Sequence, residues 1–132
     1  MRIVSTNIHG LFDYLLGVYL ITLPWLFGYA VIGGPATWIP VVLGVWLIAY
    51  SLLTDYEWGL VKSIPVRGHL ILDLVVGATL FLSIPFFGFF DTTAWIPHTA
   101  AAVLIVAGGL FTRQEPEADR PFIPHREKLL PP

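Results

Sequence analysis

Two histidine–aspartate pairs are the side chains in this sequence whose types and spacing best suit chemistry. His9 and Asp13 stand four residues apart, and His69 and Asp73 repeat that spacing. Residues at i and i+4 share one face of a helix, so each pair points the same way. Imidazole and carboxylate groups bind Zn, Fe or Mn and also move protons. His9, Asp13, His69 and Asp73 therefore form a candidate metal site, with Zn, Fe or Mn as candidate ions.

The same four side chains fit three kinds of role. In the first, each aspartate accepts a hydrogen bond from its histidine or pairs with an arginine, and the cluster only joins helix ends. In the second, it serves a metal-binding or proton- and ion-handling transporter or channel, which predicts an oligomer. In the third, it serves a small membrane-embedded enzyme. The first role, in a non-catalytic structural or interaction protein, is favoured because an i,i+4 pair is common on helices.

Charged residues between the two copies can form a second layer around the site. Asp55, Tyr56 and Glu57 can add oxygen ligands, and Arg67 can neutralise a carboxylate, although a solvated charged loop is the simpler interpretation. Haem, which needs a pair of suitably placed axial ligands, is not expected. His9 and His69 can lie at one depth and could form such a pair in geometry. His98 cannot join them, because it is predicted at the opposite membrane face, about 20 Å away by helix rise.

Other catalytic motifs are missing from the sequence. It contains no nucleophile elbow, phosphate loop, zincin motif or dinucleotide fingerprint. There is no cysteine, which excludes disulfides and thiolate ligands. These observations argue against an enzyme without excluding one.

The composition places these residues in a membrane protein. Of 132 residues, 56% are hydrophobic and 12% are charged, whereas soluble proteins average about 25% charged residues. Such a chain cannot cover a compact surface with polar groups, so its predicted solvent is lipid. The net charge of −2 gives no basic footprint for nucleic acid.

Four apolar segments can each cross a bilayer as a helix, which takes about 20 residues. They span residues of about 8–31, 38–54, 69–90 and 95–112. The apolar runs are continuous rather than alternating, which favours helices over strands. The sequence therefore predicts an all-α, integral membrane four-helix bundle over residues 1–112.

The four segments form two copies of one unit, about 8–54 and 69–112. The second and fourth segments begin with Trp38-Ile39-Pro40 and Trp95-Ile96-Pro97, which predicts proline in the first turn of both helices. Each copy leaves and returns on the same side, so the copies are parallel repeats related by a pseudo-two-fold axis along the membrane normal. The two His/Asp pairs then lie at equal depth.

The basic residues predict the orientation. All seven fall on one side of the four segments: Arg2, Lys62, Arg67, Arg113, Arg120, Arg126 and Lys128. The positive-inside rule then puts both termini in the cytoplasm, in a multi-pass protein of the inner membrane. Residues 113–132 form a proline-rich cytoplasmic tail. The predicted partners are membrane lipid and either further copies of the chain or another membrane protein, through the aromatic outer ends around 86–90.

Short repeated motifs resemble a known family. Leu-Pro-Trp-Leu-Phe-Gly at 23–28 and Ser-Ile-Pro-Phe-Phe-Gly at 83–88 are similar to the repeats of the SPW-repeat membrane proteins. These are small bacterial and archaeal proteins with duplicated two-helix units. The resemblance covers about residues 8–112, although the Ser-Pro-Trp of the name is Leu-Pro-Trp in one copy and Ile-Pro-Phe in the other. It implies the architecture and no particular activity.

Overall fold

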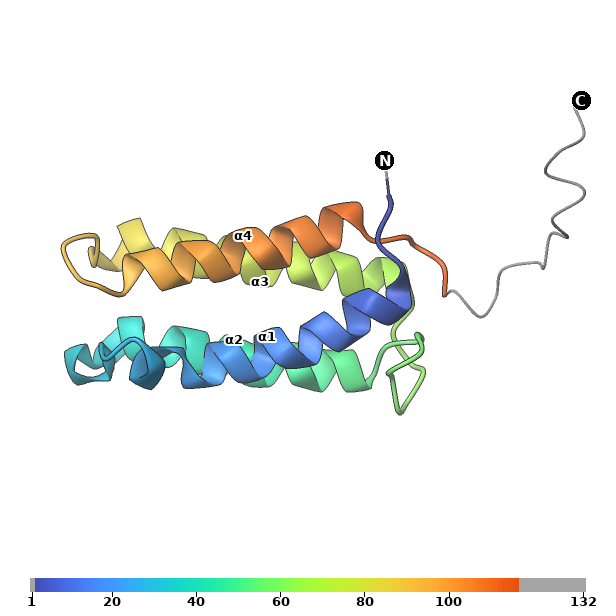
Figure 1. Ribbon diagram of the computed structural model, residues 1–132, viewed down its shortest axis with the longest axis horizontal. Coiled ribbons are helices and arrows are strands. Elements are labelled where there is room, and N and C mark those ends of the chain that lie inside the picture. The colour runs from blue at the N-terminus through green and yellow to red at the C-terminus, as the bar shows by residue number, and fades with distance from the viewer. Residues whose placement is uncertain (1, 117–132) are drawn as a thin grey trace, which may run out of the picture.

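The computed structural model describes residues 2–116, which form four long α-helices and one short 3-10 helix (Figure 1). In chain order they are α1 (Thr6–Leu26), η1 (Ala30–Ile32), α2 (Gly34–Leu52), α3 (Val66–Phe87) and α4 (Trp95–Phe111). The predicted all-α fold is confirmed. The predicted tail can be followed only to residue 116, because residues 117–132 lie outside the described part of the chain.

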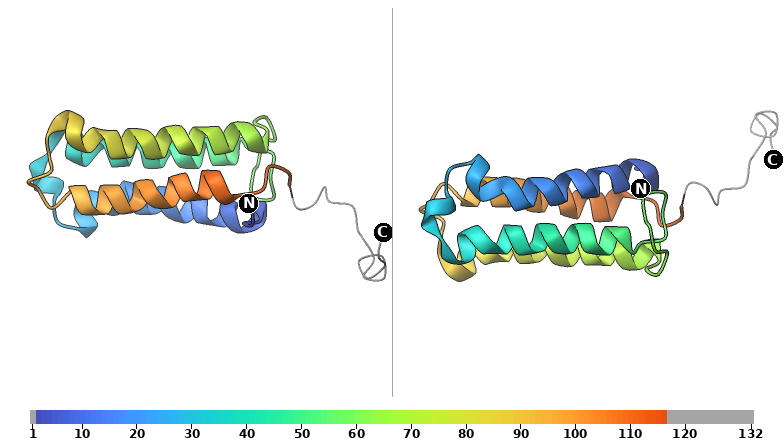
Figure 2. Two further views of the ribbon diagram at one scale, coloured as in Figure 1. Left: turned by 90° about the horizontal axis from the view of Figure 1, so that it is seen from above. Right: turned by 90° about the horizontal axis from the view of Figure 1, so that it is seen from below.

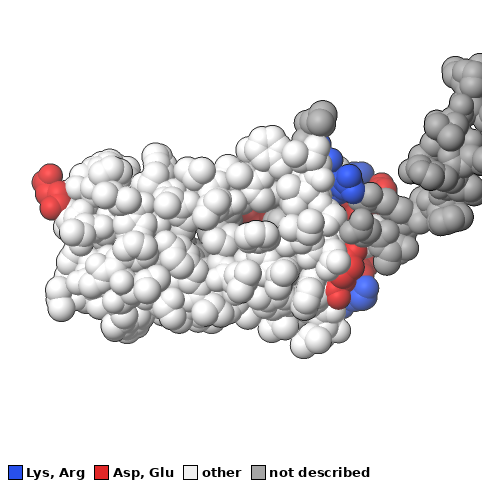
Figure 3. Space-filling view, in the orientation of Figure 1, with Lys and Arg blue, Asp and Glu red and all other residues white. Residues whose placement is uncertain are grey.

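The helices have the length and composition of membrane spans. Helices α1, α2 and α3 have 21, 19 and 22 residues and are apolar enough to cross a bilayer, and α4 is an apolar helix of 17 residues. The long flank seen in Figure 3 is almost free of charge, and Lys and Arg side chains gather at one end of the bundle. The protein is therefore a multi-pass helical membrane protein.

Local backbone chemistry moves the helix ends away from the predicted limits. Helix α1 begins at Thr6 rather than near residue 8, because the Ser5 side chain accepts a hydrogen bond from the Ile8 N–H and caps the helix. It ends at Leu26 rather than near 31, and Gly28 then turns the chain with a φ of 70°. Helix α3 likewise spans 66–87 instead of about 69–90, and Gly88 ends it in the left-handed conformation.

The predicted place of Pro40 in a first turn is wrong. Helix α2 begins at Gly34, and Pro35 occupies the first turn instead, where a missing N–H is tolerated. Pro40 therefore lies inside α2. The corresponding prediction for Pro97 is correct, because α4 begins at Trp95.

The four helices pack as a square of neighbours. Contacts join α1 to α2, α2 to α3, α3 to α4 and α4 to α1, and the α4–α1 contact is the smallest of the four. The two views in Figure 2 agree with this order and place α1 and α3 at opposite corners. The bundle centre is therefore where side chains of α1 and α3 can meet.

Glycines bring the two helices of each hairpin close together. A Cβ atom added at Gly44 of α2 would lie 2.6 Å from the Gly17 carbonyl oxygen of α1. A Cβ atom at Gly77 of α3 would lie 3.1 Å from the Ala102 carbonyl oxygen of α4. Small residues of this kind mark close helix contacts in membranes. A Cβ atom at Gly17 would in turn lie 3.2 Å from the Gly44 carbonyl oxygen, so Gly44 and Ala102 hold matching places in the two repeats.

Gly44→Leu is expected to destabilise the protein, because the added side chain must push α1 away from α2. Overpacking of this kind costs about 1–3 kcal/mol. Thermal unfolding of the purified protein in detergent would show a lower midpoint. Val45→Leu is the matched control, because Val45 is 55% exposed on the same helix. Equal midpoints for the two variants would contradict the close contact.

Candidate metal centre

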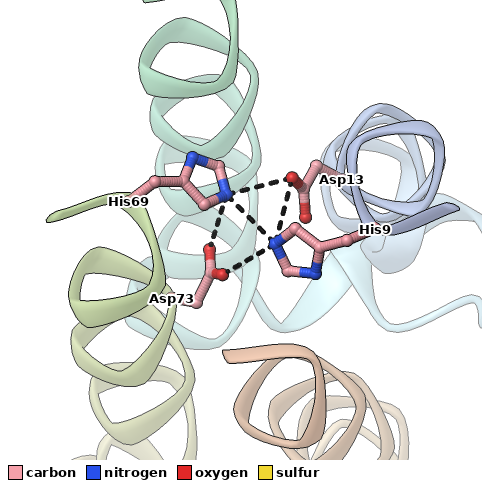
Figure 4. Close-up of side chains that lie close together, drawn as sticks. All are labelled: His9, Asp13, His69 and Asp73. Atoms are coloured by element: carbon pink, nitrogen blue, oxygen red, sulfur yellow. Dashed lines mark hydrogen bonds and ion pairs between the residues drawn. The ribbon is translucent and has the colours of Figure 1, made fainter. Parts of the chain in front are cut away.

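The four predicted residues meet between the helices, near the end of the bundle where α1 and α3 begin (Figure 4). His9 and Asp13 extend from α1, and His69 and Asp73 extend from α3, the helix at the opposite corner. One nitrogen or oxygen atom from each residue lies within 4.8 Å of the others. All four side chains are buried, with 5% or less of the surface of any of these residues exposed. Charged groups this far from water need partners, and here they are one another.

The shortest contacts run between the helices rather than along them. His9 Nε2 lies 3.1 Å from Asp73 Oδ2, and His69 Nε2 lies 3.0 Å from Asp13 Oδ2. The distances within each i,i+4 pair are longer, 3.4 Å for His9–Asp13 and 3.5 Å for His69–Asp73. The two Nε2 atoms are 3.2 Å apart. The cluster therefore links α1 to α3.

The outer nitrogen of each imidazole contacts a threonine. His69 Nδ1 lies 2.8 Å from Thr54 Oγ1, and His9 Nδ1 lies 3.0 Å from Thr112 Oγ1. The Thr54 hydroxyl already donates its proton to the Tyr50 carbonyl oxygen at 2.7 Å. It must therefore accept the proton of His69 Nδ1, and in the neutral ring Nε2 then presents a lone pair to the cluster.

Backbone pairing positions the two threonines. Thr54 follows α2 and forms a parallel bridge with Ile64, which precedes α3; Thr112 follows α4 and forms one with Val4, which precedes α1. In each case the end of one hairpin lies beside the start of the helix that carries the contacted histidine. Thr54 and Thr112 thus hold matching places in the two repeats.

Two tyrosines bind the carboxylates. Tyr50 donates to Asp73 Oδ1 at 2.6 Å, and Tyr56 donates to Asp13 Oδ2 at 3.3 Å. Tyr56 lies between α2 and α3, and burial raises the pKa of its phenol above the usual value. Its hydroxyl therefore remains a donor at neutral pH. These contacts fix the rotamers of both aspartates.

The predicted second layer stands apart from the four groups. Asp55 pairs with Lys62 at 3.2 Å, and both side chains are about half exposed. Glu57 accepts a hydrogen bond from Thr6 at 2.9 Å. Arg67 is exposed. The shell around the cluster consists instead of hydroxyl groups, from Tyr and Thr side chains.

His98 lies outside the cluster, in the first turn of α4 near the other end of the bundle. It is fully buried, with Nδ1 2.8 Å from the Ala94 carbonyl oxygen and 3.4 Å from the Tyr29 hydroxyl. Its distance from the cluster agrees with the predicted place at the opposite end of the helices, and its hydrogen bonds lie within the protein.

The sequence pattern did not indicate Tyr50, Thr54 and Thr112 as contacts of the cluster, whereas Tyr56 was expected near it. One signal was present: a threonine ends the second helix of both repeats. Their partners, however, are far along the chain, 103 residues away for Thr112 and His9. Spacing within one helix does not reveal such contacts.

Most of the donor separations match those around a four-coordinate metal ion. A metal with bonds of about 2.0–2.1 Å holds four donors about 3.3–3.4 Å apart. The His–His and His–Asp separations of 3.0–3.5 Å surround that value. The buried Asp73 Oδ2 atom also has no hydrogen-bond partner among the described residues, although His9 Nε2 is near. His9, Asp13, His69 and Asp73 can therefore supply a complete set of four ligands.

Fold and site together define a multi-pass helical membrane protein with a buried cluster of two histidines and two aspartates. Residues 7–112 match the SPW repeat domain, so the chain belongs to the SPW repeat family, as the motifs at 23–28 and 83–88 predict. No curated protein and no solved structure shows significant similarity to the chain.

Proposed function

We propose that the protein is a non-catalytic membrane protein whose His/Asp cluster binds one divalent transition-metal ion, and that the ion ties α1 to α3. The observation that carries this proposal is the convergence of His9, Asp13, His69 and Asp73, each of which offers one ligand atom within 4.8 Å of the others. The ligand set of imidazole and carboxylate favours Zn, with Fe or Mn as further candidates.

Charge also supports a divalent ion. Two buried carboxylates carry two negative charges, and a divalent cation between neutral imidazoles would balance them. The threonine contact at His69 Nδ1 leaves the Nε2 lone pair free to bind the ion. Metal-bound histidines in proteins almost always donate their second N–H to an acceptor that fixes the ring orientation, and here the Thr54 hydroxyl can take that place.

The ligand count favours a structural role for the ion. Structural zinc sites use four protein ligands, whereas catalytic sites use three and leave a position for water or substrate. Here four side chains from two helices converge with little exposure. The other features remain proposals from the sequence: an inner-membrane location, both termini in the cytoplasm, and contact with lipid and with further copies or another membrane protein.

The full-length protein, purified in detergent and dialysed with excess Zn²⁺, is expected to retain one ion per chain by elemental analysis. The double variant His9→Ala/His69→Ala is expected to retain none, because two of four ligands are gone. His125→Ala is the matched control, since it removes a histidine of the predicted tail. A folded wild-type protein without bound Zn, Fe or Mn would overturn the proposal in favour of a purely hydrogen-bonded cluster.

A further inference from the structure

The two sides of the cluster differ at one position. Thr54 and Thr112 hold matching places beside His69 and His9, so the residues one turn earlier, Tyr50 and Gly108, also match. The Tyr50 ring packs against His69 with centroids 4.9 Å apart. On the other side Gly108 has no side chain, and a Cβ atom there would already lie 3.2 Å from His9 Cε1.

A groove of about 420 Å³ opens beside Gly108, the position that corresponds to Tyr50 on the other side of the cluster. It runs between α1 and α4, the pair of neighbouring helices with the smallest contact. His9, Asp13 and Gly108 lie in its wall. Figure 3 shows a small patch of acidic residue within a hollow of the otherwise uncharged flank.

The mouth of the groove faces the lipid. Phe12, Leu15 and Leu104 line it and are 54–57% exposed. The wall continues along α1 as far as Tyr19, about 15 Å from His9 at 1.5 Å per residue. The groove thus has a polar end at the cluster and an apolar length that leads toward the middle of the helices.

A hydrogen-bond acceptor is left over at the polar end. Within residues 2–116, the hydrogen bonds and ion pairs of Asp13 all involve Oδ2, which His9, His69 and Tyr56 contact. Oδ1 is thus the carboxylate oxygen that can accept a further hydrogen bond. By contrast, Asp73 Oδ1 receives the Tyr50 hydroxyl at 2.6 Å.

We propose that this groove binds a membrane-soluble quinol. Its ring takes the place that a tyrosine at position 108 would fill, beside His9, and its hydroxyl donates to Asp13 Oδ1. The hydrocarbon tail lies along α1 toward Tyr19. The inference rests on the proposed function insofar as Asp13 offers Oδ2 to the metal and Oδ1 to the quinol.

Charge distinguishes a quinol from a phospholipid headgroup. With a divalent ion balancing the two carboxylates, a phosphate would bring an unpaired negative charge into the groove, which no Lys or Arg lines among the described residues. Burying an unpaired charge in an apolar site costs much free energy. A neutral ring with a hydroxyl donor avoids this cost and matches the acceptor.

Binding of a hydroquinone with a decyl chain to the full-length protein in detergent tests the proposal. Equilibrium dialysis is expected to show saturable binding of one molecule per chain. Leu104→Trp is expected to weaken it at least tenfold by filling the groove. Val103→Trp is the matched control, because Val103 is 59% exposed on the same helix but lines a different groove. This variant should bind the hydroquinone as the wild type does.

The dimethyl ether of the same hydroquinone separates a hydrogen bond from simple lipid-like contact. It cannot donate to Asp13, so at least tenfold weaker binding is expected. Equal binding of the ether, or equal loss in both tryptophan variants, would mean that the groove holds only hydrocarbon chains and would overturn the proposal. Metal content is measured in the same samples: quinol failure with Zn present refutes only this inference, and loss of Zn with quinol bound refutes only the metal site.

Discussion

Asp73→Asn is expected to lower the free energy of unfolding by about 3–5 kcal/mol, the cost of removing one partner from a buried ion pair. Asp73 is 1% exposed, lies 3.1 Å from His9 Nε2 and accepts the Tyr50 hydroxyl at 2.6 Å. Asparagine keeps the size of the side chain and removes its charge. The midpoint of thermal unfolding in detergent, measured with EDTA and with Zn²⁺, reports the change. Zn²⁺ should stabilise the wild type more than the variant.

Two comparisons make this expectation specific. Asp91→Asn removes a carboxylate that is exposed near the opposite end of the bundle, so it should change stability by less than about 0.5 kcal/mol. The double variant His9→Asn/Asp73→Asn should cost less than the sum of the two single changes, because neither leaves a partner behind in the double. Strict additivity, or an Asp73 effect no larger than that of Asp91, would mean that the cluster does not join α1 to α3.

The fold was largely predictable because its signals are local. Apolar segments of membrane length and their repetition give the four helices and their order. The helix ends were less predictable, since single residues decide them. Ser5 starts α1 early by capping it, and Pro35 replaces Pro40 as the first-turn proline of α2. The pseudo-two-fold symmetry of the repeats, and the direction of its axis relative to the membrane, stay predictions.

The four central residues of the site were predictable, and their surroundings were not. His9 and Asp13 could be grouped with His69 and Asp73 because duplication places them at one depth and polar groups avoid lipid. The partners of these side chains depend on how the repeats dock. Tyr50 comes from a third helix, and Tyr56 comes from the connection after it. Gly108 can be matched with Tyr50, and so recognised as the open side of the cluster, only once Thr112 is known to contact His9.

The docking of the repeats also decides which hydroxyl group contacts the outer ring nitrogen of each histidine. Thr54 stands between the Tyr50 carbonyl oxygen and His69 Nδ1, and so sets which ring nitrogen of His69 keeps its proton. If the cluster binds metal, this hydroxyl should matter as much for affinity as for stability. Its replacement is therefore a sharper test of metal binding than loss of a ligand.

Thr54→Val is expected to weaken Zn²⁺ binding by about 10–100-fold, the usual effect of losing a group that orients a metal ligand. Valine has nearly the shape of threonine, so packing is retained while His69 Nδ1 loses its acceptor at 2.8 Å. Competition with a chelating dye measures the affinity of the purified protein. Thr54→Ser restores the hydroxyl and should recover most of the lost affinity.

Thr79→Val is the matched control for the hydroxyl itself. Thr79 also donates to the carbonyl oxygen four residues earlier, Val75, but it is exposed on α3 and does not contact the cluster. Its loss should leave Zn²⁺ affinity unchanged. If Thr54→Val binds Zn²⁺ as tightly as wild type does, the imidazole is oriented without its threonine. The ion would then bind by another arrangement, and the hydrogen bonds at His69 would serve folding alone.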